Sequence, residues 1–122
     1  MARIVLGLGT SHSPQLNTPP DLWPLHAERD RANPGVVASG GLSHFVIDEE
    51  LDWRVLEGLK AKDARSLVTL PFEKLNSGNS EIRNWLAAAG ALERLEMRLI
   101  DYVPCYRSEA GTGCAMAFAT WT

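Results

Sequence analysis

Residues 36–62 read VVASGGLSHFVIDEELDWRVLEGLKAK, and this stretch decides the fold class. The apolar run Val36–Ala38 is typical of a short buried strand, and the glycine-bearing loop 39–41 follows it. Apolar residues then recur at helical spacing at Leu51, Val55, Leu56 and Leu59, which predicts a helix from Asp48 to about Lys62. A strand, a loop and an amphipathic helix in succession predict an α/β fold.

Similar patterns predict further elements on both sides of this unit. Toward the N-terminus we expect a buried strand at Arg3–Gly9, a polar loop at 9–14 and a helix from Asp21 to about Arg31. Toward the C-terminus we expect a short helix at 63–70, a helix from about Glu81 with Gly90 as its C-terminal cap, and strands at Met97–Tyr106 and Cys114–Trp121. Pro104 predicts that the strand Met97–Tyr106 is irregular or lies at a sheet edge.

Length and composition fit one globular domain spanning residues 1–122. Its 122 residues are 45% hydrophobic and 22% charged, which excludes a disordered chain. Twelve Lys and Arg against fifteen Asp and Glu give a net charge of −3, so nucleic acid and membrane surfaces are not expected partners. With two cysteines and no signal-peptide pattern, we expect a cytoplasmic protein without a disulfide framework.

Two of the three histidines occur in the same local context. His12 and His44 each lie beside serine, after a predicted strand and a glycine-bearing loop, so both imidazoles could enter one crevice. An imidazole serves there as a metal ligand or as a general base. His26 is interpreted as a solvated or capping helix residue. Glu81 is either a first-turn carboxylate favoured by the helix dipole or an oxygen ligand, and two histidines with one carboxylate suit non-haem Fe(II).

Other kinds of site fit the sequence poorly. Gly7 and Gly9 follow a predicted strand, but a dinucleotide-binding loop needs glycine at position 12, which is histidine. A serine nucleophile is not favoured, because no G-x-S-x-G elbow is present. Cys105 and Cys114 lack the paired spacing of a zinc site and are interpreted as small buried hydrophobic residues.

Four segments together resemble the class III extradiol ring-cleavage dioxygenases, the superfamily of the catalytic subunit of protocatechuate 4,5-dioxygenase and of the gallate dioxygenases. They are GTSHSP at 9–14, SGGLSH at 39–44, EIRNWLAAAGA at 81–91 and YVPCYRSEAGTG at 102–113, in the family's order. The resemblance implies a single small α/β domain, a reduced core of that fold with a mixed sheet flanked by helices.

The resemblance also implies a mononuclear non-haem Fe(II) centre that acts on a catecholic substrate and O2. His12 and Glu81 match the family's metal ligands. His44 matches the active-site histidine that is not a ligand and that acts as acid and base. No other cofactor is implied.

This chain departs from the family in its middle. Family members carry a long central segment, with a further histidine ligand, between the two histidine motifs; here the family's N-terminal segment, 1–33, runs almost directly into its C-terminal segment, 36–122. Two hypotheses follow: an internally truncated dioxygenase, or a catalytically inactive remnant or oligomeric assembly module of the same fold. A homo-oligomer could supply a ligand from a second chain.

Overall fold

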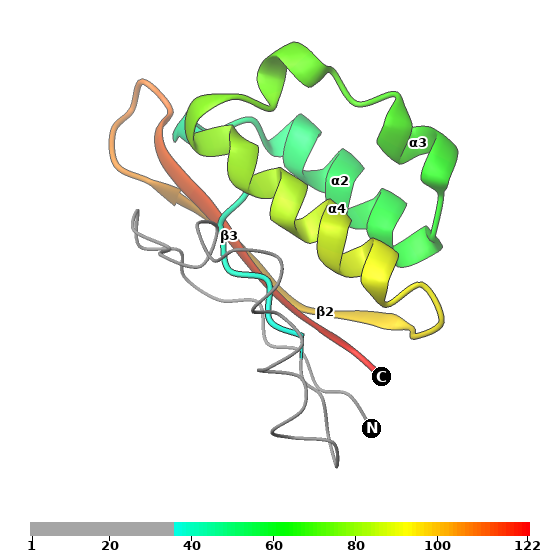
Figure 1. Ribbon diagram of the computed structural model, residues 1–122. Coiled ribbons are helices and arrows are strands. Elements are labelled where there is room, and N and C mark those ends of the chain that lie inside the picture. The colour runs from blue at the N-terminus through cyan, green and yellow to red at the C-terminus, as the bar shows by residue number, and fades with distance from the viewer. Residues whose placement is uncertain (1–35) are drawn as a thin grey trace, which may run out of the picture.

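The computed structural model describes residues 36–122, which fold into a small α/β unit with helices on one side of an antiparallel sheet (Figure 1). The strands are β1 (His44–Val46), β2 (Met97–Tyr106) and β3 (Thr112–Trp121), in the order β1-β3-β2. The helices are α2 (Glu49–Ala61), α3 (Ala64–Val68) and α4 (Ile82–Ala91), with short 3-10 turns η3 (Phe72–Lys74) and η4 (Ser77–Glu81) before α4. None of these helices is long and apolar enough to span a membrane.

The predicted α/β class is confirmed for the described residues. The sheet expected from the resemblance is mixed, with parallel and antiparallel strands. The three strands of residues 36–122 pair only in antiparallel fashion. The predicted strand Arg3–Gly9, the loop 9–14 and the helix Asp21–Arg31 lie outside the described residues, as do His12 and His26.

The predicted helix from Asp48 to Lys62 is confirmed, with both ends capped. The Asp48 side chain accepts a hydrogen bond from the Leu51 N–H, and Lys62 ends the helix in the left-handed conformation. The apolar face of α2 packs against α4 and β2, and it includes Val55, which is fully buried. The short helix predicted at 63–70 is confirmed as α3.

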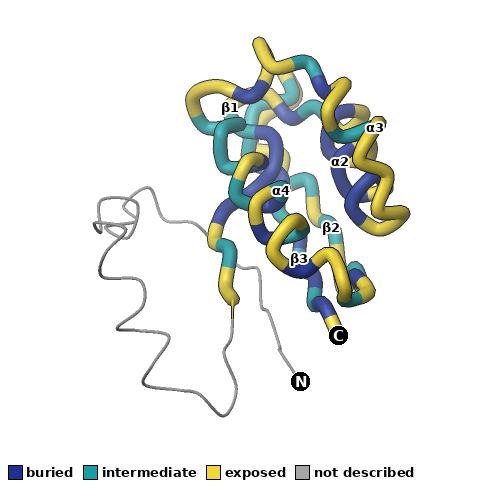
Figure 2. Tube along the Cα trace, turned by 45° about the vertical axis from the view of Figure 1, so that its right-hand side comes forward, coloured by how far each residue is buried: buried dark blue, intermediate teal, exposed yellow. Residues whose placement is uncertain are grey.

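Strand β3 packs on the helices through every second residue. Its small residues Ala115, Ala117 and Ala119 and its last residue, Trp121, are buried, whereas the residues between them are half-buried. Because alternate residues of a strand face opposite sides, this pattern places the alanines under the helices, where their small side chains allow close approach. Figure 2 colours the residues by burial, and along the strand buried residues alternate with half-buried ones.

Among the strands of residues 36–122, β2 lies at the sheet edge, as Pro104 predicts. Pro104 pairs with Ala115 in regular register, and the irregularity lies at Ile100 instead, where the register shifts between Leu99 and Asp101. An edge strand tolerates proline because one side of its backbone needs no ladder partner.

Three local predictions are wrong. Val36–Ala38 forms no strand; both valines are exposed, and the first strand of the described residues, β1, begins at His44 instead. Gly90 does not end α4, which continues to Ala91 with Leu92 as its C-cap, because the buried Leu92 side chain keeps the chain packed on the core. Cys105 is exposed and Cys114 half-buried, so neither is a buried hydrophobic residue.

Candidate functional site

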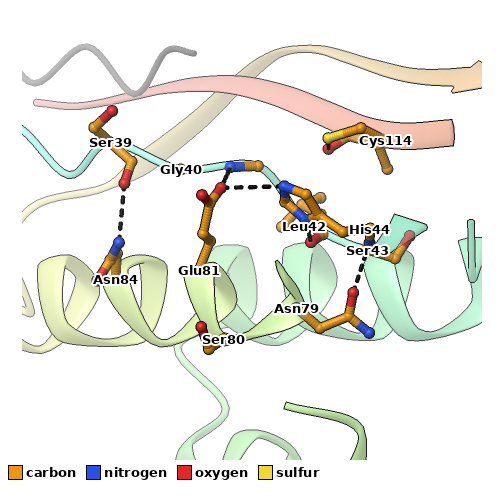
Figure 3. A network of polar contacts seen from close by, with 12 residues as sticks. Ser39, Gly40, Leu42, Ser43, His44, Asn79, Ser80, Glu81, Asn84 and Cys114 are labelled. Carbon is orange, nitrogen blue, oxygen red and sulfur yellow. Dashed lines mark hydrogen bonds and ion pairs between the residues drawn. The ribbon is translucent and has the colours of Figure 1, made fainter. Parts of the chain in front are cut away.

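The site lies where the 39–44 segment passes the N-terminus of α4. Glu81, the last residue of η4, lies directly before that helix rather than in its first turn as predicted. Three side chains at helical spacing reach the segment. Glu81 Oε2 accepts the Gly41 N–H, and Asn84 Nδ2 donates to Ser39 O at 2.9 Å (Figure 3). Trp85 Nε1 donates to Gly40 O at 3.1 Å. Residues at i, i+3 and i+4 share one helix face, so this spacing fixes the loop against α4.

Two of the predicted site residues meet here. His44 Nε2 lies 3.3 Å from Glu81 Oε2, and both side chains remain partly accessible, at 19% and 25% (Figure 3). The other predicted ligand, His12, lies outside the described residues. Within residues 36–122, no group of three or more metal-ligating side chains is arranged to hold a metal ion.

The His44 ring is oriented by its second nitrogen. Nδ1 lies 2.8 Å from the carbonyl oxygen of Leu42. A carbonyl only accepts, so Nδ1 carries a proton and donates it. Nε2 then faces a carboxylate oxygen, and both atoms are acceptors unless a further proton lies between them. His44 and Glu81 therefore form a pair suited to holding one exchangeable proton at Nε2.

Close packing explains the glycines of the SGGLSH motif. A Cβ on Gly40 would lie 2.9 Å from Glu81 Cβ, and Gly40 has φ +155°, which disfavours other residues. A Cβ on Gly41 would lie 2.9 Å from Ala115 O and 3.0 Å from His44 Cε1. Both positions therefore need glycine so that the main chain can approach Glu81 and β3.

The backbone of His44 is held from η4. Asn79 Oδ1 accepts the His44 N–H at 2.5 Å. Phe45, the next residue, has φ +67°, a left-handed conformation that is strained for an aromatic residue. Such strain persists only where surrounding contacts determine it, and the Asn79 bond is one of those contacts.

A buried polar network lies behind His44, and the sequence analysis missed it. Asp52 Oδ1 accepts the Ser43 N–H at 2.8 Å, while Oδ2 accepts the hydroxyls of Ser43 at 2.7 Å and Tyr102 at 2.8 Å. We call these three residues the Asp52 network. Asp52 lies three and four residues before Val55 and Leu56, on the apolar face of α2, and a carboxylate on such a face is the signal that could have found it.

Burial controls the ionisation of this network. It raises the pKa of Asp52 above its ordinary 3.8, against the lowering effect of the hydrogen bonds from Ser43 and Tyr102. Burial, followed by the hydrogen bond to Asp52, raises the pKa of Tyr102 well above 10.0. The Tyr102 hydroxyl therefore keeps its proton and donates it to Asp52.

Cys114 lies opposite His44 in the β1–β3 register. Burial, followed by the charge of Glu81, raises the pKa of its thiol above 9.0. Cys114 therefore adds a neutral thiol beside the His44–Glu81 pair near neutral pH (Figure 3).

The raised pKa of Asp52 predicts that its contribution to the stability of the fold increases as pH falls. A folded-state pKa above 3.8 means that the fold favours protonated Asp52, so this residue's contribution is fully present below pH 3.8 and is lost as pH rises through the folded-state pKa. We expect wild type to gain stability relative to Asp52→Asn as pH falls from neutral toward 3.8. Urea unfolding of both proteins across this range measures the difference; a difference that is constant, or that shrinks as pH falls, would contradict the raised pKa.

Gly78 offers a second test of the site's packing. A Cβ there would lie 2.5 Å from His44 Cβ and 2.8 Å from His44 Cγ, so Gly78→Ala must displace the ring or η4. We expect a loss of about 1–3 kcal/mol in the free energy of unfolding. Gly90→Ala is the matched control, because a Cβ at Gly90 meets nothing within 4 Å and alanine favours the helix by about 0.5–1 kcal/mol. Urea unfolding of both variants checks the sign, and equal effects would contradict the packing described above.

Comparisons of the chain with protein-family models, with curated proteins and with solved structures give no match.

Proposed function

We propose that this chain forms a non-haem Fe(II) centre of the extradiol ring-cleavage type, on a reduced core of the class III extradiol dioxygenase fold. The substrate class is a catechol-type aromatic compound together with O2. One observation carries the proposal. His44 and Glu81, 37 positions apart in the sequence, meet with Nε2 and Oε2 at 3.3 Å, and these are the residues that match the family's acid–base histidine and its carboxylate ligand.

The donor set suits Fe(II). One carboxylate with histidines is the ligand combination of the 2-His-1-carboxylate iron sites. In this proposal Glu81 and His12 hold the metal, and a further ligand comes from outside this pair. The contacts of Glu81 within residues 36–122 fall on Oε2, and its side chain is partly accessible, so the carboxylate suits a ligand role. When bound, the metal supplies Lewis-acid stabilisation of the deprotonated substrate and the redox chemistry with O2.

His44 provides the proton transfer. Its Nδ1–H is anchored to the Leu42 carbonyl, which leaves Nε2 to exchange a proton. Nε2 is then the ring nitrogen that takes a proton from a substrate hydroxyl and returns it. Glu81 Oε2 lies 3.3 Å from Nε2, beside the position of this exchangeable proton. Cys114 is neutral and adds no competing negative charge.

The second candidate is a non-catalytic assembly module of the same fold. The observation that favours it is the exposure of two large apolar residues next to His44: Phe45 is 67% exposed and Val46 is 61% exposed. Exposed apolar residues beside one another are typical of surfaces that pair with another chain. This candidate predicts a dimer or larger assembly with no turnover.

One experiment separates these functions. The full chain is reconstituted anaerobically with Fe(II), freed of excess metal and mixed with protocatechuate, gallate or catechol, while O2 uptake and the absorbance of ring-opened products are followed. The proposal predicts iron-dependent O2 uptake with at least one of the three compounds. A chain that has neither bound iron nor O2 uptake, and that sediments as an oligomer, would support the assembly module instead.

A further inference from the structure

The Asp52 network joins three elements at a point behind the site. Asp52 comes from α2, Tyr102 from β2, and Ser43 directly precedes β1. The Asp52 side chain is fully buried, and its two oxygens take both the main-chain N–H and the hydroxyl of Ser43. A residue held by its backbone and its side chain at once, on one fixed carboxylate, has little freedom to rotate.

The residue held in this way precedes His44. Besides its bonds to Asp52, Ser43 exchanges main-chain contacts with β3, where its carbonyl accepts the Ala115 N–H at 2.8 Å. Its hydroxyl also accepts the Asp48 N–H at 2.9 Å, at the start of α2. The peptide that joins Ser43 to His44 is therefore fixed on the Ser43 side by Asp52 and β3, and on the His44 side by Asn79 (Figure 3).

We propose that Asp52 is a positioning residue for His44: acting through Ser43, it fixes the imidazole with Nδ1–H on the Leu42 carbonyl and Nε2 toward Glu81. The hydrogen bonds of Asp52 go to Ser43 and Tyr102 and not to the His44 ring, so Asp52 is not a catalytic residue. That this orientation serves catalysis rests on the proposed function. The orientation of the His44 ring itself can be measured in the protein without iron.

A positioning role and a merely structural role of Asp52 predict different protonation of the two His44 ring nitrogens. A neutral imidazole that is free in water carries its proton mainly on Nε2, whereas His44 carries it on Nδ1. If Asp52 only fills the core, its loss lowers stability and leaves the ring unchanged. If Asp52 positions His44, its loss moves the ring proton toward Nε2, because the hydrogen bond from Nδ1–H to the Leu42 carbonyl is no longer held in place.

The test is the tautomer of His44 in the full chain without metal. Long-range 15N–1H correlation spectra of 15N-histidine-labelled protein distinguish the two neutral forms at mildly alkaline pH, with His44→Gln used to assign the signal. We expect an Nδ1–H pattern in wild type and in Asp52→Asn, whose amide keeps an acceptor for the Ser43 N–H. We expect a shift toward Nε2–H in Asp52→Ala and, because one bond is lost, a smaller shift in Ser43→Ala.

A matched control separates positioning from stability. Leu59→Ala removes a buried side chain from the same face of α2 without touching Ser43, so it destabilises the fold and is expected to keep the Nδ1–H pattern. Ser43→Ala keeps the test decisive if Asp52→Ala does not fold. An unchanged Nδ1–H pattern in folded Ser43→Ala and Asp52→Ala, or an equal shift in Leu59→Ala, would overturn the proposal. These spectra need no iron or turnover, so a failure of the proposed function would appear separately, in the O2-uptake assay.

Discussion

His44→Ala is expected to abolish ring cleavage while leaving Fe(II) bound. A positioned general acid–base contributes about 10²–10⁴-fold to a rate, and His44 is the described side chain whose ring nitrogen faces the proposed ligand Glu81. Removing the imidazole also removes the proton held at Nε2, but it leaves the Glu81 carboxylate on the Gly41 N–H. The measurements are O2 uptake and the iron content per chain after anaerobic reconstitution.

His26→Ala is the control for this experiment. His26 is the remaining histidine and is interpreted from the sequence as a solvated or capping helix residue, so its removal is expected to leave iron content and O2 uptake unchanged. Loss of iron from His44→Ala would make His44 a ligand rather than an acid–base group. Retained turnover in His44→Ala would exclude the acid–base role.

Asp52→Ala is expected to destabilise the fold strongly. It removes the acceptor for the Ser43 N–H and for the hydroxyls of Ser43 and Tyr102. A buried donor left without a partner costs about 1–3 kcal/mol. We expect a loss of about 3 kcal/mol or more in the free energy of unfolding, measured by urea denaturation near neutral pH.

Asp52→Asn is the matched variant for this loss. Its carbonyl oxygen can replace Oδ1 on the Ser43 N–H, and its amide can donate to the two hydroxyls, which rotate to accept. Because burial raises the pKa of Asp52, removing its charge also removes a desolvation cost at neutral pH. We expect the stability of Asp52→Asn to lie within about 1 kcal/mol of wild type. Equal losses for alanine and asparagine would contradict the hydrogen-bond account.

The sequence predicts elements best where the signal is local and periodic. Helix α2 is predicted to within one residue at each end, because its apolar spacing and its Asp48 cap agree. Strands β2 and β3 are predicted because apolar residues run between clear turn signals. The strand predicted at Val36–Ala38 fails because β-branched composition does not say which residues find a ladder partner, and the partner Cys114 pairs with His44.

The site depends on contacts that sequence periodicity does not encode. His44 and Glu81 were assigned roles from a resemblance, and their proximity depends on the 39–44 segment binding the N-terminus of α4. Asp52 belongs to no loop motif, but a carboxylate among Leu51, Val55 and Leu56 on an apolar helix face already requires a buried partner. Tyr102, 50 positions away from Asp52, supplies one of those partners, and no local pattern predicts it.

Anaerobic Fe(II) binding to the full chain and to its Glu81→Gln variant, measured by equilibrium dialysis, tests the central claim most directly. Glutamine keeps the size of the side chain and an acceptor for the Gly41 N–H, but it removes the negative charge of the proposed carboxylate ligand. The account predicts one iron per wild-type chain and a loss of at least about tenfold in affinity in the variant. Equal binding by the two proteins, or no binding by wild type, would contradict it.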